Sequence, residues 1–195
     1  MTTLDHPDQT KLFGKLPFQQ TPDVAVRYAE SLGPDKHPRQ ARAVIREAAC
    51  RHILDEVIAW MGPDAEGRRE SVLADLMAHV DSDGYAFARS LERANWVGVD
   101  SDLVDILNGY FAAHASIERE MIEAWVKANA IALDLAAGAR VVDMRPSADF
   151  KRPDGSPRTG TIVDTRPTTA DYVVQFDGET ANHGNRGGEI LRPDQ

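Results

Sequence analysis

Hydrophobic residues repeat with a helical period through the first two thirds of the chain. The clearest case is the stretch that ends at Met61, in which every fourth position is apolar: Ile45, Ala49, Ile53, Val57 and Met61. This spacing is typical of a helix with one apolar face. Several such helices must bury their apolar faces against one another, so the pattern predicts a helical bundle.

Turn and capping residues divide this part into five helices. Thr21-Pro22-Asp23 opens the first, Gly33-Pro34 closes it, and Gly62-Pro63 closes the second. The sequence predicts helices over 21–33, 38–61, 66–80, a fourth through 85–91, and a last one over 101–138 with a bend or break at Gly109 and 112–116. The apolar connector 96–99 is expected to pack against the bundle.

After Gly138 the apolar residues alternate instead, which is typical of strands. The residues 159–165 and 172–176 alternate, and Asp177-Gly178 is a turn signal after the second of these runs. Strands are therefore expected over 140–144, 159–165, 172–176 and 189–191, and turn-rich loops over 152–157, 167–170 and 182–188.

Two short runs in this segment resemble a known fold. Gly160-Thr161-Ile162 and Val174-Gln175-Phe176-Asp177-Gly178 are similar to strand starts and ends in SH3-like small β-barrels of the KOW/Tudor type. The resemblance implies a small barrel that binds extended ligands through its loops. The segment departs from a Tudor aromatic cage, because it holds few aromatic residues and Phe176 is expected in the core. It is also less basic than a nucleic-acid-binding barrel.

The sequence thus predicts an α+β protein in three parts. An extended leader occupies residues 1–20, an all-α helical bundle residues 21–137, and an SH3-like small β-barrel residues 138–195. An apolar content of 42% and a charged content of 27% are ordinary for a folded chain of 195 residues.

The net charge of −9 lies almost entirely in the helical part. Residues 1–138 hold 14 Lys and Arg against 22 Asp and Glu, and residues 139–195 hold 8 against 9. An acidic surface disfavours phosphate contacts, so we do not expect the helices to bind nucleic acid.

Neither a membrane span nor a disulfide is expected. No apolar run reaches the 18 residues that a membrane helix needs. The single cysteine, Cys50, lies in an apolar helical run and is expected to be a buried thiol. The sequence therefore predicts a cytoplasmic protein without membrane partners.

The candidate ligand-binding residues lie in the C-terminal segment. A basic loop with one aromatic residue could bind a phosphate backbone or an acidic peptide. Because Asp149 and Asp154 balance its charge, a solvated loop is the simpler interpretation. The candidates are Arg145, Phe150, Lys151, Arg152, Arg158 and Tyr172.

Metal and catalytic signals are weak. His114 and Glu118 are four residues apart on a predicted helix, as are Asp75 and His79, and His52 and Glu56. Such pairs could contribute to a metal site only if a second helix supplied partners. No nucleophile elbow, phosphate-binding loop or dinucleotide fingerprint occurs, so neither a catalytic residue nor a cofactor is predicted.

The preferred hypothesis is a non-enzymatic accessory or adaptor protein. Its acidic helical domain would bind a protein partner or a second copy of the chain, and its barrel a second ligand. Two alternatives stay open: an enzyme or metalloprotein with a site in the bundle near His114, Glu118, His52 or His79, and nucleic-acid binding through the barrel loops.

Overall fold

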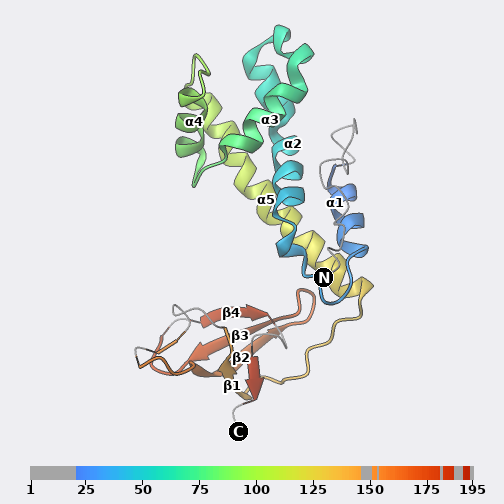
Figure 1. Cartoon of the computed structure of the whole chain (residues 1–195), viewed down its shortest axis with the longest axis vertical. Coiled ribbons are helices and arrows are strands. Elements are labelled where there is room, and N and C mark those ends of the chain that lie inside the picture. The colour runs from blue at the N-terminus through green and yellow to red at the C-terminus, as the bar shows by residue number, and fades with distance from the viewer. Residues whose placement is uncertain (1–20, 146–150, 153, 181, 187–190, 194–195) are drawn as a thin grey trace, which may run out of the picture. The chain divides into compact units, whose positions relative to one another are not determined.

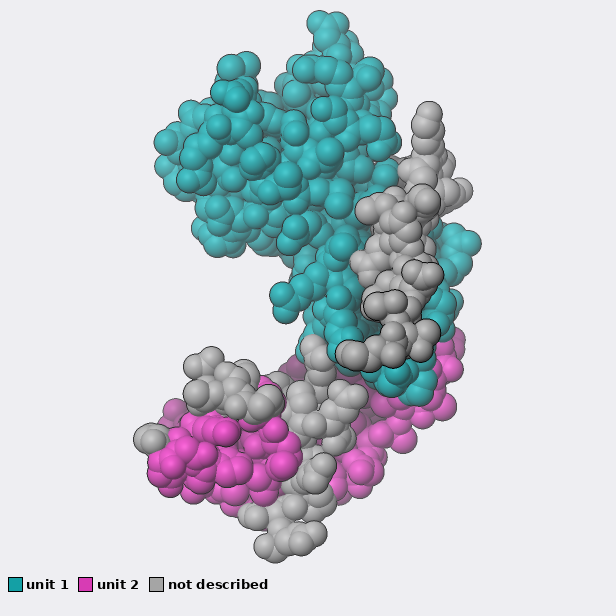
Figure 2. All heavy atoms as spheres, viewed as in Figure 1, with its two compact units in different colours: residues 1–125 teal, residues 126–195 magenta. Residues whose placement is uncertain are grey.

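The computed structural model describes residues 21–145, 151–152, 154–180, 182–186 and 191–193. The chain forms two compact units, residues 1–125 and residues 126–195 (Figure 2). The first is helical and the second holds an antiparallel sheet (Figure 1), which confirms the predicted α+β class. The predicted leader lies outside the described residues.

Among the described residues, five α-helices form the helical part of the chain, close to the predicted ranges. Helices α2 and α3 are each preceded by a 3-10 turn, at Pro38–Gln40 and Pro63–Arg68. The bounds are α1 Thr21–Glu30, α2 Arg42–Met61, α3 Arg69–His79, α4 Gly84–Arg93 and α5 Ser101–Ala128.

Helix α5 differs from its prediction at two points. It runs unbroken through Gly109, and it ends at Ala128 instead of Gly138. The break is not needed because Gly109 faces α2, with the side chain of Ile53 3.5 Å from where a Cβ would lie. The helix ends where Ala130 adopts a positive φ of 49° and the Ile131 N–H donates to the Val126 carbonyl at 3.0 Å.

The helices pack against one another through buried apolar side chains. Helix α2 packs against α1 and α3, and α3 packs against α4. Helix α4 lies against α5, where the Gly84 N–H donates to Asn108 Oδ1 at 3.1 Å and the rings of Phe87 and Tyr110 meet edge to face at 5.9 Å. Cys50 is fully buried, as predicted, and burial raises the pKa of its thiol to about 12, so it is unreactive at neutral pH.

The described residues of the sheet unit form five strands in the order β4-β3-β2-β1-β5, all antiparallel. The segment 182–186 was predicted as a loop but forms a strand, because the free edge of β3 supplies a hydrogen-bonding partner for it. The bounds are β1 Arg140–Asp143, β2 Thr159–Arg166, β3 Asp171–Phe176, β4 Asn182–Arg186 and β5 Leu191–Pro193.

The prediction of a closed barrel is wrong. Strands β4 and β5 lie at opposite edges of the sheet, and no pairing among the described residues joins them. The sheet is therefore open, although its last strand pairs with its first.

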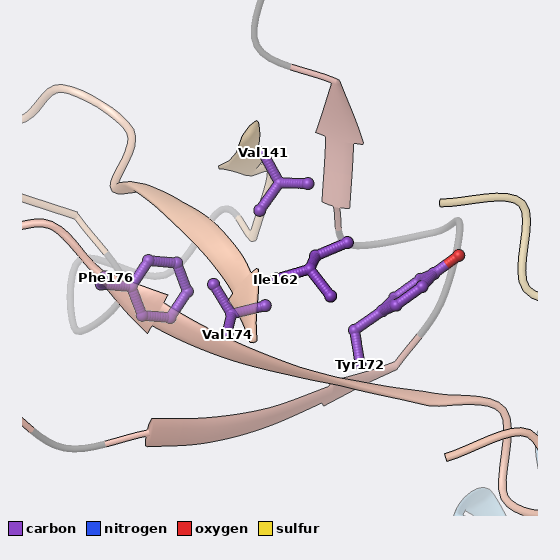
Figure 3. Packing of buried hydrophobic residues seen from close by; sticks show 5 residues of the cluster. All are labelled: Val141, Ile162, Tyr172, Val174 and Phe176. Carbon is purple, nitrogen blue, oxygen red and sulfur yellow. The ribbon is translucent and has the colours of Figure 1, made fainter. Parts of the chain in front are cut away.

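One face of the sheet carries the apolar core of this unit. Figure 3 shows its five buried side chains, and the partly buried Leu133, Leu135 and Ala139 pack against them. The segment before β1 therefore belongs to the sheet unit and does not extend α5. The five core residues are Val141, Ile162, Tyr172, Val174 and Phe176.

Candidate functional site

A pocket of about 610 Å³ opens in the helical unit. It lies between the end of α2, helix α3 and the connection from α4 to α5. This volume falls in the range of pockets that bind small molecules. Its lining combines two tryptophans with charged residues, chiefly Trp60, Trp96, Arg68, Asp75, Val97 and Asp100.

Carboxylates hold both tryptophans in place. Trp60 Nε1 donates to Asp100 Oδ1 at 3.1 Å, and Trp96 Nε1 donates to Asp75 Oδ2 at 3.2 Å. The N–H edge of each indole is therefore engaged, and the rings offer a ligand their carbon surface. The same contacts place two negative charges in the pocket lining.

The local backbone explains how Trp96 reaches the pocket. Helix α4 ends at Arg93, and Asn95, two residues later, has a φ of 69° that reverses the chain. The N–H groups of Asn95 and Trp96 donate to the Glu92 and Leu91 carbonyls at 3.0 and 3.1 Å. These two bonds form a Schellman C-cap. The cap turns the chain sharply after α4, and Trp96 follows at once.

Asp100 serves the fold as well as the pocket. Its Oδ1 also accepts a hydrogen bond from the Leu103 N–H at 3.0 Å, so it caps the N-terminus of α5. Capping fixes the carboxylate in the position at which it meets Trp60. The geometry of the pocket is thus tied to the start of a long helix.

The surroundings of the pocket are strongly acidic. The segment 60–105 holds ten Asp and Glu against four Lys and Arg, a net charge of −6 out of −9 for the chain. Two of its four cations are used locally, since Arg69 pairs with Asp55 and Glu66, and Arg89 pairs with Glu92. Arg68 is the cation in the pocket lining.

The sequence did not indicate this pocket. The connector 96–99 was predicted to pack against the bundle, but Val97 is 87% exposed at the rim. Trp60, at the end of the predicted helix 38–61, is half-buried. One sequence signal could have indicated it. Trp96 lies in the short connector between Asn95, which follows the end of a helix, and Asp100, which caps the next one, so it belongs to no apolar helix face.

The predicted basic loop of the sheet unit is largely paired internally. Arg145 Nε donates to both carboxylate oxygens of the buried Asp143, at 2.8 and 3.0 Å. Arg158 Nη2 lies 2.9 Å from Glu179 Oε1, at an angle outside hydrogen-bond geometry, and its guanidinium carbon lies 3.8 Å from the Phe176 ring centre. Arg145 is therefore paired with Asp143, and Arg158 packs over the Phe176 ring beside Glu179.

A second group of polar side chains lies at the exposed end of β3. Arg140 Nη1 and Nη2 donate to the two oxygens of Asp177, each at 2.7 Å. Arg152 Nη2 lies 3.5 Å from Asp177 and 2.5 Å from Thr159 Oγ1. These contacts hold the pKa of Asp177 well below its usual range. Lys151 is exposed.

One of the two predicted aromatic ligand residues, Tyr172, lies in the core of the sheet unit. Tyr172 is fully buried, its hydroxyl donates to Asp134 Oδ1 at 2.8 Å, and it accepts from the Leu135 N–H at 3.0 Å. Its ring is thus a core element that holds the segment before β1. Phe150 lies outside the described residues.

The weak metal candidates form no cluster of three ligands among the described residues. Glu118 accepts from Arg39 Nε at 2.6 Å, and His114 Nδ1 lies 3.9 Å from Glu118. Asp75 binds Trp96, and His79 Nδ1 lies 3.4 Å from the Ser90 hydroxyl. Within the described ranges no three potential ligands cluster as a metal site would require.

No family model, curated protein or solved structure matches this chain. Among the helices that the structure describes, none has the length and apolar character to cross a membrane.

Proposed function

We propose that this chain is a non-enzymatic adaptor whose acidic helical unit binds a segment of a partner protein at the Trp60–Trp96 pocket. The observation that carries the proposal is the pocket itself, in which two indoles are held by Asp75 and Asp100. Tryptophan is enriched among the residues that carry most of the binding energy at protein interfaces. The same proposal places the adaptor in the cytoplasm, where its one buried thiol stays reduced.

A random peptide library selected on the full-length chain tests this function. The peptides that are enriched should lose binding to the Trp96→Ala and Val97→Ser variants. Val97 is 87% exposed, so its replacement leaves the fold intact even if loss of Trp96 does not. The matched control is Val163→Ser, an exposed valine on β2. Enrichment of no peptide, or peptides that bind the pocket variants unchanged, would contradict the proposal.

We further propose that the sheet unit binds the second, acidic ligand of the adaptor at the face formed by Arg140, Lys151 and Arg152. These cations are exposed, which supports the proposal. The Asp177 carboxylate also binds both guanidinium nitrogens of Arg140, so this arginine already accommodates a carboxylate. A glutamate-rich peptide should bind more tightly to Asp177→Asn and more weakly to Lys151→Gln. Equal affinity for wild type and both variants would count against this ligand.

We relate the sheet unit to the SH3-like small barrels, as an open form. The proposal is supported by the strand order, a meander from β1 to β4 with β5 paired back to β1. An experimental structure of this unit, compared with known folds, tests the relation. A strand order other than β4-β3-β2-β1-β5 would overturn it.

A further inference from the structure

The pocket of the helical unit has a chemical character that goes beyond partner binding in general. We infer that it receives a cationic side chain, an arginine or lysine of a basic partner segment, over the indoles and between Asp75 and Asp100. This inference rests on the proposed function, since it names what the partner inserts.

The indole rings supply the first part of the argument. A cation is attracted to the face of an aromatic ring, and tryptophan is the best of the aromatic side chains for this contact. The N–H edges of Trp60 and Trp96 are occupied by Asp100 and Asp75. The rings therefore present carbon surface to a ligand, which suits the stem and the charged head of an arginine or lysine.

The carboxylates supply the second part. Each of the described hydrogen bonds from an indole uses one oxygen, Asp100 Oδ1 or Asp75 Oδ2. The indole N–H is neutral, so neither contact neutralises the carboxylate charge. A guanidinium or ammonium group that enters the pocket would therefore meet two carboxylates, and the negative charge of each would attract it.

The field around the pocket points the same way. The segment 60–105 carries a net charge of −6, which attracts basic segments and repels acidic ones. Arg68 is the one cationic residue in the pocket lining, and its charge repels a cationic ligand. Replacing Arg68 with a neutral residue should therefore strengthen the binding of a cation and weaken the binding of an anion.

Three matched peptides test the inference on the full-length chain. Each is a Gly-Ser peptide with four equally spaced residues, which are arginine in the first, citrulline in the second and glutamate in the third. Citrulline keeps the shape of arginine without its charge. We expect the arginine peptide to bind and to change the fluorescence of the tryptophans, and the other two to bind at least tenfold more weakly.

Charge variants locate the binding. Asp75→Asn and Asp100→Asn keep an oxygen for each indole and a helix cap at 100, so the double variant removes charge with little change in shape. It should bind the arginine peptide roughly three- to tenfold more weakly. The control Asp64→Asn with Asp81→Asn removes the same charge outside the lining and should have a smaller effect.

Cation variants give the opposite sign. Arg68→Gln should bind the arginine peptide a few-fold more tightly, whereas Arg93→Gln, outside the lining, should change little. At the rim, Val97→Lys should weaken binding and Val97→Glu should strengthen it.

The outcomes separate the inference from the proposed function. Equal binding of the citrulline peptide, or weaker binding by Arg68→Gln, would overturn the cationic ligand and leave a pocket for another kind of partner segment. Library peptides that depend on Trp96 but carry no cation would do the same. If no peptide of any kind depends on the pocket, the proposed function fails with it.

Discussion

At the scale of single residues, three of the side chains that the sequence offered as ligands make contacts within the sheet unit: Arg145, Arg158 and Tyr172. Arg145 neutralises a buried carboxylate, and the Tyr172 hydroxyl binds the segment that precedes β1. Residue types alone could not reveal this, because the pairing depends on strand register. Arg140, for instance, lies opposite Thr161 on β2 and reaches Asp177 beyond the end of β3.

The paired Asp177 predicts a specific acid sensitivity of the sheet unit. Its pKa is held low in the folded state, chiefly by Arg140, so its contribution to stability is present above the unfolded value near 4 and is lost as the pH falls below it. The melting temperature of the sheet unit can be followed by the NMR signals of its amides between pH 7 and pH 2. It should fall less steeply with decreasing pH in Asp177→Asn than in wild type. Asp164→Asn, an exposed carboxylate on β2, is the control, and equal slopes for all three proteins would contradict the assignment.

Tyr172 predicts the strength of the link between the sheet and the preceding segment. Tyr172→Phe leaves the Leu135 N–H and the Asp134 carboxylate without this hydroxyl, which should destabilise the sheet unit by about 1–2 kcal/mol. Faster hydrogen exchange of the β3 amides would report the loss. Tyr85→Phe, whose ring is 66% exposed, should leave exchange unchanged, and an unchanged rate in Tyr172→Phe would show that the two bonds contribute little.

At the scale of elements, the helical period placed four helices well and misjudged the end of the fifth. Ile131 and Leu135 lie in the predicted helix 101–138, and their four-residue spacing fits a helical period. With Leu133 between them, however, they also alternate with a period of two. Leu133 and Leu135 pack on the sheet core, so the tertiary contact decided between two patterns that the sequence allows equally. Strand β4 was missed because its residues favour turns and only pairing with β3 makes them a strand.

Two glycines on α4 and α5 predict opposite effects of the same substitution. Gly109→Ala meets only Ile53 at 3.5 Å within a continuous helix, so it should stabilise the helical unit by about 0.5–1 kcal/mol. Gly84→Ala would bring its Cβ to 2.7 Å from the Val104 carbonyl oxygen and should destabilise by about 1–3 kcal/mol. Urea unfolding followed by tryptophan fluorescence measures both, since all three tryptophans lie in this unit. Stabilisation by Gly84→Ala would show that α4 and α5 separate easily.

At the scale of the whole molecule, the sequence shows how charge is divided between the two parts of the chain, but it does not locate the pocket. The acidic excess of residues 1–138 is a property of the sequence. The pocket is not, because it joins the end of α2, α3 and a connector, and only the packing of the three brings Asp75 to Trp96 and Asp100 to Trp60. The charge of the acidic surface attracts a ligand from a distance, whereas the pocket acts on the ligand only by direct contact.

This difference in range predicts how salt acts on the binding of the arginine peptide. The field of the segment 60–105 acts over a Debye length, which shrinks from about 30 Å at 0.01 M salt to about 3 Å at 1 M. Added salt should therefore slow association strongly and change dissociation little. Stopped-flow tryptophan fluorescence separates the two rates. The Asp64→Asn, Asp81→Asn variant should also slow association, whereas the Asp75→Asn, Asp100→Asn variant should speed dissociation, because it removes contacts that form only in the complex. If both variants changed association alone, the cation would be held by the general field of the acidic unit and not by the pocket.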